Sequence, residues 1–156
     1  MVNITDNKKY IGYLTSGINL DHIPSGNAWY IIKILNLQNK ENQIGVGLNL
    51  PSKKLGVKDL IKIENRVLSK DEIDAISLFC VGSTLSVIKD FQVVVKKTID
   101  LPAMINNIIV CPNKRCVSHQ HVSKFISSKN RQGKINLACH YCEQVFLLDD
   151  IKNYNI

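Results

Sequence analysis

The clearest chemical signal in this sequence comes from four cysteines in the last third of the chain. Cys111 and Cys116 lie in CPNKRC, and Cys139 and Cys142 follow in ACHYC. Two short cysteine pairs of this kind can place four thiolates around a tetrahedral metal ion such as Zn²⁺. Because four thiolates fill every coordination position, the predicted zinc site is structural and has no open position at which water could be activated.

The composition is that of a folded protein. Of the 156 residues, 45% are hydrophobic and 6% are aromatic, which is enough for one medium domain or two small ones. The N-terminal stretch MVNITDNKKY has no apolar run of signal-peptide length. No segment approaches the roughly 18 unbroken apolar residues of a membrane span. We therefore expect a cytoplasmic protein with no membrane association.

Two alternatives to a four-thiolate site are open. The cysteines could form disulfides, although these are rare in a reducing cytoplasm. His119, His121 or His140 could replace one thiolate, although the four cysteines already form two complete pairs. The remaining cysteine, Cys80, falls on the apolar stripe of a predicted helix, where a thiol usually behaves as a small buried hydrophobe.

The net charge of +7 comes from 20 Lys and Arg against 13 Asp and Glu, and it is spread along the chain. Proteins that bind DNA or RNA usually concentrate positive charge on one face or arm. The densest basic runs here are doublets such as Lys53-Lys54 and Lys96-Lys97. We therefore expect a solvated basic surface and no nucleic-acid partner, while an anionic small ligand stays open.

Hydrophobic periodicity predicts the elements that must position these residues. Ser25 is a candidate N-cap for the first helix, and Ser69 with Glu72 forms the S-x-x-E capping pattern of the second. The predicted order is a strand at 8–17, a helix at 27–38, strands at 43–52 and 59–65, a helix at 69–79 and two strands within 84–98. This succession suits an α+β fold, a ferredoxin-like antiparallel sheet with two helices on one face.

A second domain is predicted after Pro102, where the pattern of strands and helices ends. Residues 103–156 are too few to bury a self-sufficient core, and in domains of this size a metal commonly replaces missing hydrophobic burial. We therefore divide the chain into residues 1–102 and a small all-β zinc-binding domain at residues 103–156.

Four runs carry a resemblance that covers nearly the whole chain: LDHIPSG, IGVGLNLPSKKLGVKDLIKIEN, DLPAMINNIIVCPNKRCVSH and CHYCEQVF. In this order and spacing they resemble the regulatory chain of aspartate carbamoyltransferase. The resemblance implies a non-catalytic subunit in pyrimidine biosynthesis that responds to CTP and UTP as inhibitors and to ATP as activator. It also implies an allosteric nucleotide-binding domain at residues 1–102, a homodimer of regulatory chains, and one structural zinc per chain.

The domain at residues 103–156 would then dock on the catalytic chain of aspartate carbamoyltransferase. The resemblance places the loop Pro112 to Arg115 and Glu143 at that contact. The alternative from a different class is a zinc-ribbon nucleic-acid-binding protein. An enzyme is a poorer third reading, because no pair of nucleophile and base stands out.

A nucleotide site is supported from the residues by one observation. Lys58 and Lys62 are four apart on a predicted strand, so both side chains leave the same face, where an anion would relieve their repulsion. Taken singly, paired strand lysines are usually solvent-facing, and Asp21 and His22 are usually ordinary polar residues of a turn.

The resemblance assigns roles to twelve residues of this site. Lys58, Lys62 and Lys96 would contact phosphate or ribose. Asp21 would accept from the ribose hydroxyls, and His22 would lie against the phosphates. The remaining residues are the base-reading strand Ile11, Gly12, Tyr13 and Leu14, the apolar Ile88 and Val93 beside the nucleoside, and Ser86 near the pocket. Gly12 and Ser86 stand where the family commonly has an acidic residue and an asparagine, which bears on base discrimination.

Overall fold

The computed structural model describes residues 13–39 and 41–156. The chain divides into two compact units, Met1–Asp100 and Leu101–Ile156, which we describe separately. Among the described residues, no helix is both long and apolar enough to cross a membrane.

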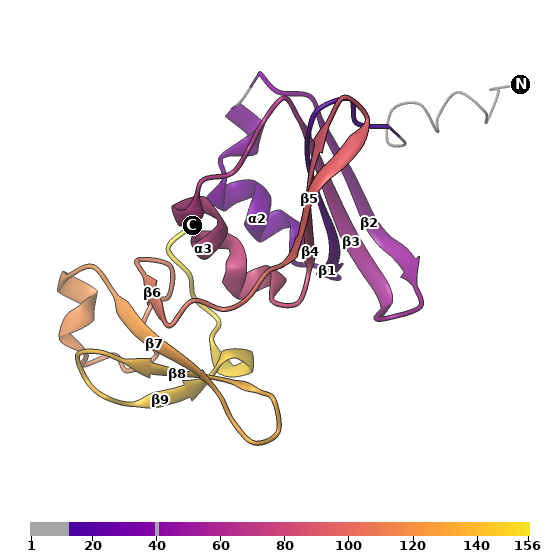
Figure 1. Cartoon of the computed structure of the whole chain (residues 1–156). Helices are drawn as coiled ribbons and strands as arrows, with labels where there is room; N and C mark the ends of the chain where they lie inside the picture. Colours follow the sequence, from indigo (N-terminus) through magenta and orange to yellow (C-terminus); the bar gives the residue numbers. More distant parts are fainter. Residues whose placement is uncertain (1–12, 40) are drawn as a thin grey trace, which may run out of the picture. The chain divides into compact units, whose positions relative to one another are not determined.

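The first unit is a five-stranded sheet with two helices on one side, as Figure 1 shows. Its elements are β1 (Gly17–Pro24), α2 (Ala28–Ile34), the 3-10 turn η1 (Leu37–Asn39), β2 (Ile44–Ser52), β3 (Gly56–Glu64), α3 (Lys70–Cys80), β4 (Thr84–Lys89) and β5 (Gln92–Thr98). The strands lie in the order β2-β3-β1-β4-β5, and every neighbouring pair is antiparallel. This is the predicted ferredoxin-like sheet, with β5 added at the edge beside β4.

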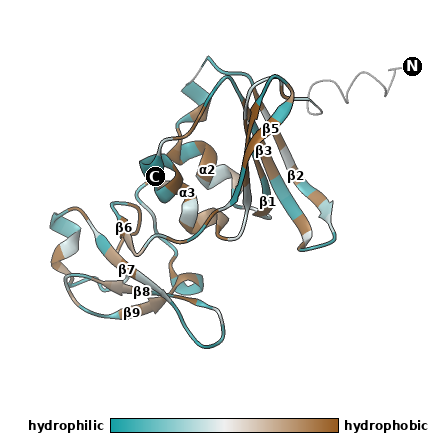
Figure 2. Ribbon diagram, viewed as in Figure 1, coloured by the Kyte–Doolittle hydropathy of each residue, from teal (hydrophilic) through white to brown (hydrophobic). Residues whose placement is uncertain are grey.

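Alternation along the strands separates an apolar face from a polar one. Ile18 and Leu20 of β1, and Ile61 and Ile63 of β3, are fully buried on the face that carries the helices. Figure 2 shows the resulting alternation of hydrophobic and hydrophilic colour along the strands. The residues that alternate with these buried ones point to the opposite face of the sheet. We call this opposite face the site face.

The first strand of the described chain differs from the predicted one. Residues 8–12 of the predicted strand at 8–17 lie outside the described residues, and Tyr13 and Leu14, which are described, are not in a strand. The strand is Gly17–Pro24, and its register against β3 shifts between Leu20 and Ile23. This β-bulge interrupts the two-residue period that identifies a strand, which is why the sequence pattern did not reveal it.

The first helix does not use the predicted cap. Ser25 Oγ donates instead to Asn49 Oδ1 at 2.5 Å. The amides at the start of α2 are satisfied by the buried carboxylate of Asp59 on β3, whose Oδ2 accepts from Gly26 N–H at 2.8 Å and from Ala28 N–H at 3.4 Å. The cap therefore comes from a residue that is distant in sequence.

The same carboxylate also holds β2. Asp59 Oδ1 accepts from Asn49 N–H at 3.0 Å. Asn49 lies in a second bulge, where the register of β2 against β3 shifts between Gly47 and Leu50. Asn49 has a φ of 54°, a left-handed conformation that asparagine tolerates better than most residues. Asp59 thus joins a bulge of β2 to the start of α2.

The second helix is capped as predicted. Ser69 accepts from Glu72 N–H, and the Glu72 side chain accepts from Ser69 N–H, which completes the capping box. Arg66 also contacts Glu72 at 2.5 Å. Phe79 on the buried side of α3 stacks on Tyr30 of α2 with ring centroids 4.6 Å apart, so the two helices pack together on the sheet.

The second unit is a small antiparallel sheet, as predicted. Its elements are β6 (Met104–Asn106), η2 (Val117–Gln120), β7 (Lys124–Lys129), β8 (Ile135–Cys139), β9 (Val145–Leu147) and η3 (Leu148–Asp150). The strands lie in the order β6-β7-β8-β9. Ile109, Phe125 and Leu137 are fully buried, and Cys111, Cys116 and Cys139 are buried as well. Cysteines therefore make up a substantial part of this small interior.

We predict that Asp59→Asn lowers the free energy of unfolding by about 2–3 kcal/mol, because an amide nitrogen replaces one acceptor of a buried, hydrogen-bonded carboxylate. Urea unfolding monitored by the single tryptophan, Trp29 on α2, measures the change. Asp90→Asn is the matched control, since Asp90 is exposed and has a φ of 49°, which asparagine also adopts; we expect a change within about 0.5 kcal/mol. Equal stability of the two variants would contradict the role given to Asp59.

Candidate functional site

The four predicted metal ligands meet in the second unit. The Sγ atoms of Cys111, Cys116, Cys139 and Cys142 all lie within 4.8 Å of one another. Cys111 and Cys142 Sγ are 3.8 Å apart, and Cys116 and Cys139 Sγ are 3.7 Å apart. A tetrahedral site with Zn–S bonds of about 2.3 Å has S–S edges of about 3.8 Å, whereas a disulfide requires about 2.05 Å. The arrangement therefore fits a four-thiolate metal site and contains no disulfide.

Turns beside the strands hold the two cysteine pairs. Cys116 is the N-cap of η2, and its Sγ accepts from Ser118 N–H at 3.5 Å. Cys139 ends β8, and its carbonyl accepts from Glu143 N–H at 2.9 Å, which closes the turn that carries Cys142. Glu143 has a φ of 58°, so the chain reverses sharply after Cys142.

The thiols differ in how readily they ionise. Burial raises the pKa of Cys111 and of Cys139. At Cys116, burial also opposes ionisation, but hydrogen bonds from Ser118 and the neighbouring thiols outweigh it and lower the pKa to about 6. A metal binds deprotonated thiols. The hydrogen bonds that lower the pKa of Cys116 therefore favour one of the thiolates that a metal would need.

The histidines near the cluster make other contacts. His119 Nε2 lies 3.0 Å from the Asn113 carbonyl oxygen. His121 stacks on Tyr141 with centroids 6.2 Å apart, and His140 meets the same ring edge-on at 5.4 Å. The cluster of possible metal ligands in the described part of the chain contains the four cysteines and no histidine.

Cys80 lies apart from this cluster, on α3. Its side chain is fully buried, and its Sγ donates to the Ile76 carbonyl at 3.1 Å. Burial raises the pKa of the thiol to about 12. Cys80 is therefore a small buried side chain without thiolate chemistry at neutral pH, as the sequence predicted.

Several of the predicted nucleotide-binding residues share the site face of the first unit. Lys58 and Lys62 alternate along β3 with the buried Asp59 and Ile61, so both lysines point away from the helices. The register then carries this face across the sheet. Lys62 pairs with Asn19, Asn19 with Ser86, and Ser86 with Lys96. We call these four residues the middle row.

The neighbouring rows hold the other predicted residues. Toward one end of β1, Gly17 pairs with Glu64 and with Ile88, and Ile88 pairs with Val93. A side chain on Gly17 would lie 2.1 Å from the Ile63 carbonyl, and Gly17 has a φ of 139°, so glycine is required here. The row therefore has apolar side chains on β4 and β5 and a bare backbone at β1.

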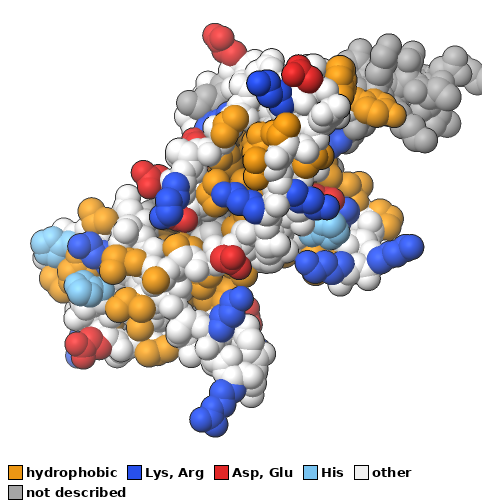
Figure 3. All heavy atoms as spheres, in the orientation of Figure 1, with side chains coloured by type: hydrophobic (Ala, Val, Ile, Leu, Met, Phe, Trp, Pro, Cys, Tyr) orange, Lys and Arg blue, Asp and Glu red, His pale blue; other side chains and the backbone are white. Residues whose placement is uncertain are grey.

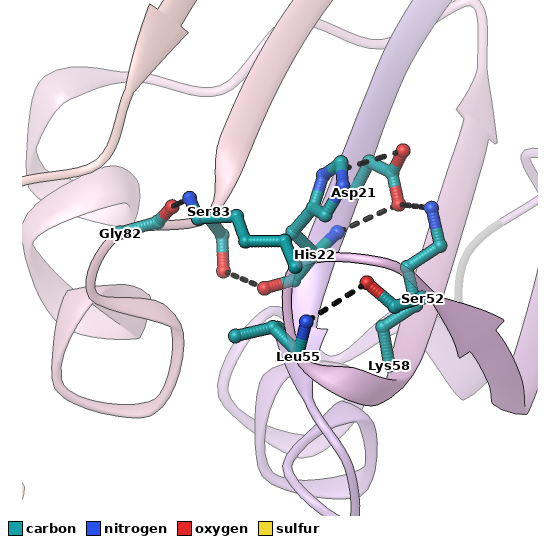
Figure 4. Close-up of polar contacts among 8 residues, drawn as sticks. Asp21, His22, Ser52, Leu55, Lys58, Gly82 and Ser83 are labelled. Atoms are coloured by element: carbon teal, nitrogen blue, oxygen red, sulfur yellow. Dashed lines mark hydrogen bonds and ion pairs between the residues drawn. The ribbon is translucent and has the colours of Figure 1, made fainter.

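Toward the other end of β1, Asp21 and His22 lie in the bulge. Asp21 Oδ1 lies 2.7 Å from Lys58 Nζ, and His22 Nδ1 is 3.5 Å from Asp21 Oδ2. Figure 4 shows Asp21 between His22 and Lys58. His22 has a φ of 59°, and its carbonyl accepts from Ser83 Oγ at 3.0 Å. The bulge thus sets the Asp21 side chain beside Lys58 and the His22 side chain beside Asp21.

The charges on this face influence one another. Burial opposes ionisation of Asp21, but hydrogen bonds from Lys58 and from His22 N–H lower the pKa of its carboxyl below the ordinary value. Burial lowers the pKa of Lys62, while the Asp21 carboxylate acts in the opposite direction. An anion near the two lysines was expected from their spacing, and within the chain this anion is Asp21.

The predicted base-reading segment is only partly described. Ile11 and Gly12 lie outside the described residues. Tyr13 is 79% exposed, and Leu14 is half-buried. The residues that line a small hollow at this end of the sheet are Tyr13, Leu14, Gln43, Gly45, Lys62 and Glu64. Asn19, Gln43 and Glu64 were not among the predicted site residues. The strand register places Asn19 and Glu64 on this face, and the lining of the hollow places Gln43 beside Glu64.

The basic residues form no dense patch on the face drawn in Figure 3, where Lys and Arg side chains are scattered among apolar and acidic ones. This distribution does not favour the nucleic-acid-binding alternative. The fold and the two residue clusters instead define a class of two-unit protein, with charged side chains gathered on a sheet face in one unit and a four-cysteine cluster that fits a metal in the other.

Comparison with known proteins agrees with that class. Residues 10–100 match the family model "Aspartate carbamoyltransferase regulatory chain, allosteric domain", and residues 103–152 match "Aspartate carbamoyltransferase regulatory chain, metal binding domain". The chain belongs to the family of aspartate carbamoyltransferase regulatory chains.

Similar chains carry the same name. The regulatory chain of Tolumonas auensis is 42% identical over 134 residues, which cover 85% of this chain and 87% of the relative. The regulatory chains of Escherichia coli strain K12 / DH10B and of Shigella boydii serotype 18 are each 39% identical over 142 residues, covering 90% of this chain and 93% of each relative.

We predict one bound metal ion per chain in the purified protein, and none in Cys139→Ser, because removing one of four ligands opens a closed site. Elemental analysis measures the metal, and circular dichroism follows the fold. Cys80→Ala is the matched control and should keep its metal, since Cys80 is in the other unit. A metal-free wild-type chain whose second unit is folded would rule the site out.

Proposed function

We propose that the chain binds nucleoside triphosphates on the site face and transmits the effect to the catalytic chains of aspartate carbamoyltransferase. CTP and UTP would act as inhibitors and ATP as activator of pyrimidine biosynthesis. The observation that carries the proposal is the convergence of Lys58, Lys62 and Lys96 on one sheet face, beside the carboxylate of Asp21.

Each part of a nucleotide has a suitable counterpart on this face. The ammonium groups of Lys58, Lys62 and Lys96 suit phosphate oxygens. Asp21 is a carboxylate that can accept from ribose hydroxyls, and His22 next to it can donate to a phosphate. The apolar side chains of Ile88 and Val93, in the same row as Gly17, suit the flat face of a nucleoside, and the backbone of Ile11 to Leu14 would read the base edge.

We further propose that the four thiolates hold one zinc ion, which stabilises the second unit and has no catalytic role. Zinc suits a closed four-thiolate site with the observed sulfur spacing. This unit would dock on the catalytic chain through the loop Pro112 to Arg115 and Glu143. Exposed apolar side chains on the same unit support a protein contact: Met104, Val117, Val122, Ile126 and Val145.

Two regulatory chains would pair through their nucleotide-binding units. The sheet ends in two edge strands, β2 and β5, and exposed edges tend to pair or to aggregate unless they are protected. On β5, Val93, Val94 and Val95 are all about half exposed. Pairing of edge strands about a two-fold axis would continue the sheet and satisfy the unpaired backbone groups.

We predict that Lys62→Ala weakens CTP binding by roughly ten- to a hundredfold, because it removes a charge-assisted contact worth on the order of 1.5–3 kcal/mol. Calorimetry on the full-length chain measures the affinity. Lys97→Ala is the matched control: Lys97 is an exposed neighbour of Lys96 that pairs with Leu85, so its side chain leaves the other face of β5, and we expect unchanged affinity. Absence of CTP and ATP binding to the wild-type chain would refute the proposed function.

The lowered pKa of Lys62 predicts that nucleotide binding takes up protons in alkaline solution. A bound phosphate favours the charged amine of Lys62 and raises its pKa. At any pH between the pKa of this amine in the free chain and its pKa in the complex, the complex therefore holds more protons than the free chain. CTP affinity should therefore fall as pH rises through this window. Calorimetry in two buffers of different ionisation enthalpy measures the uptake in alkaline solution, and the uptake should diminish as the pH is lowered and the amine becomes charged in both states. Unchanged uptake in Lys62→Ala would assign the proton to another group.

A further inference from the structure

The middle row contains an acceptor that no group in the described part of the chain satisfies. Asn19 Oδ1 is buried, and it has no hydrogen-bond partner among the described residues. Its neighbours across the strands are Lys62 on β3 and Ser86 on β4, both in direct register. A buried polar atom that lacks a partner destabilises a fold, so such an atom in a binding face points to a group supplied from outside.

The position of Asn19 on β1 fits that interpretation. Side chains at alternate positions of a strand share one face, so Asp21, Asn19 and Gly17 follow one another along the site face. They span about 13 Å at about 3.3 Å per residue. Asp21 lies beside Lys58 at the charged end, and Gly17 leaves the backbone bare beside the apolar Ile88. A ligand that reaches from the charged end to the apolar end passes over Asn19.

We propose that Asn19 is a ligand-contacting residue whose carboxamide oxygen accepts a hydrogen bond from an N–H or O–H group of the bound nucleoside. The inference rests on the proposed nucleotide function and adds to it a residue that selects for a donor. Two kinds of group on these ligands can donate such a hydrogen bond to Asn19 Oδ1. They are the exocyclic amine of cytosine or adenine and the hydroxyls of ribose. Uracil has a carbonyl in place of that amine, so an Asn19 contact to the amine would favour CTP and ATP over UTP.

The test compares wild type, Asn19→Leu and Asn19→Val as full-length, metal-loaded chains. Calorimetric titration with CTP should show about three- to thirtyfold weaker binding in both variants, because the donor of the ligand loses its acceptor. Gln38→Leu is the matched control: Gln38 is an exposed carboxamide in η1, outside the sheet, and its loss should leave the affinity unchanged.

Thermal unfolding without nucleotide separates a binding role from a structural one. Since Asn19 Oδ1 makes no hydrogen bond within the described chain, both variants should unfold at or above the wild-type midpoint. Weaker binding in a variant of unimpaired stability supports the proposal. Variants that fail to fold, or that unfold well below wild type, would show that the amide stabilises the sheet, and the proposal would be overturned.

Two further ligands identify the donor. If UTP binds the variants as it binds wild type while CTP is weakened, the donor is the base amine. If 2′-deoxy-CTP is insensitive to the substitution, the donor is the 2′-hydroxyl, and equal weakening of all three ligands points to a donor that they share. Wild-type affinity for CTP in both variants would overturn this inference alone. A wild-type chain that binds none of the three would overturn the proposed function with it.

Discussion

The buried carboxylate of Asp59 is the constraint on which the geometry of the site face depends. A buried charge is tolerated only when it is hydrogen-bonded, and Asp59 accepts from the backbone amides of Gly26, Ala28 and Asn49. Through these bonds one side chain holds the start of α2 and the bulge of β2 against β3. Because successive side chains of a strand point to opposite faces, fixing Asp59 toward the helices also fixes its neighbour Lys58 toward the site face.

The site face combines positive charges that attract anions with a negative charge that limits which anions fit. Lys58 and Lys62 alone would bind any compact polyanion, since the attraction of an ammonium group for phosphate has little directionality. The ionised carboxylate of Asp21 changes this, because it repels phosphate oxygens while it accepts from hydroxyls. Under the proposed function, a nucleotide would therefore present its phosphates to the lysines and its sugar to Asp21, and the β1 bulge that sets Asp21 beside Lys58 would define the order of these groups along the strand.

Local sequence signals predicted those parts of the molecule that short-range physics determines. The capping box of α3 and the two cysteine pairs each depend on residues a few positions apart, and the structure forms both. The strand β2 also forms, but a bulge between Gly47 and Leu50 breaks its predicted alternation and leaves Leu48 exposed. The strand β1 and the cap of α2 were missed because both depend on long-range pairing: a bulge breaks the period of β1, and Asp59 lies far along the chain from α2. Asn19 could be placed beside Lys62 only through the register of β1 and β3.

The two units are stabilised differently, which matters for how an effect could pass between them. The first buries a hydrophobic layer between helices and sheet, whereas in the second the cysteine cluster occupies much of a small interior. Under the proposed division of roles, nucleotide stabilises the state of the first unit that binds it, and the catalytic chain stabilises a state of the second, each by mass action. Neither ligand alters the other's affinity unless it binds two states of the whole chain unequally. Such coupling is reciprocal. If nucleotide changes the affinity of this chain for the catalytic chain by some factor, binding of the catalytic chain must change the affinity for nucleotide by the same factor.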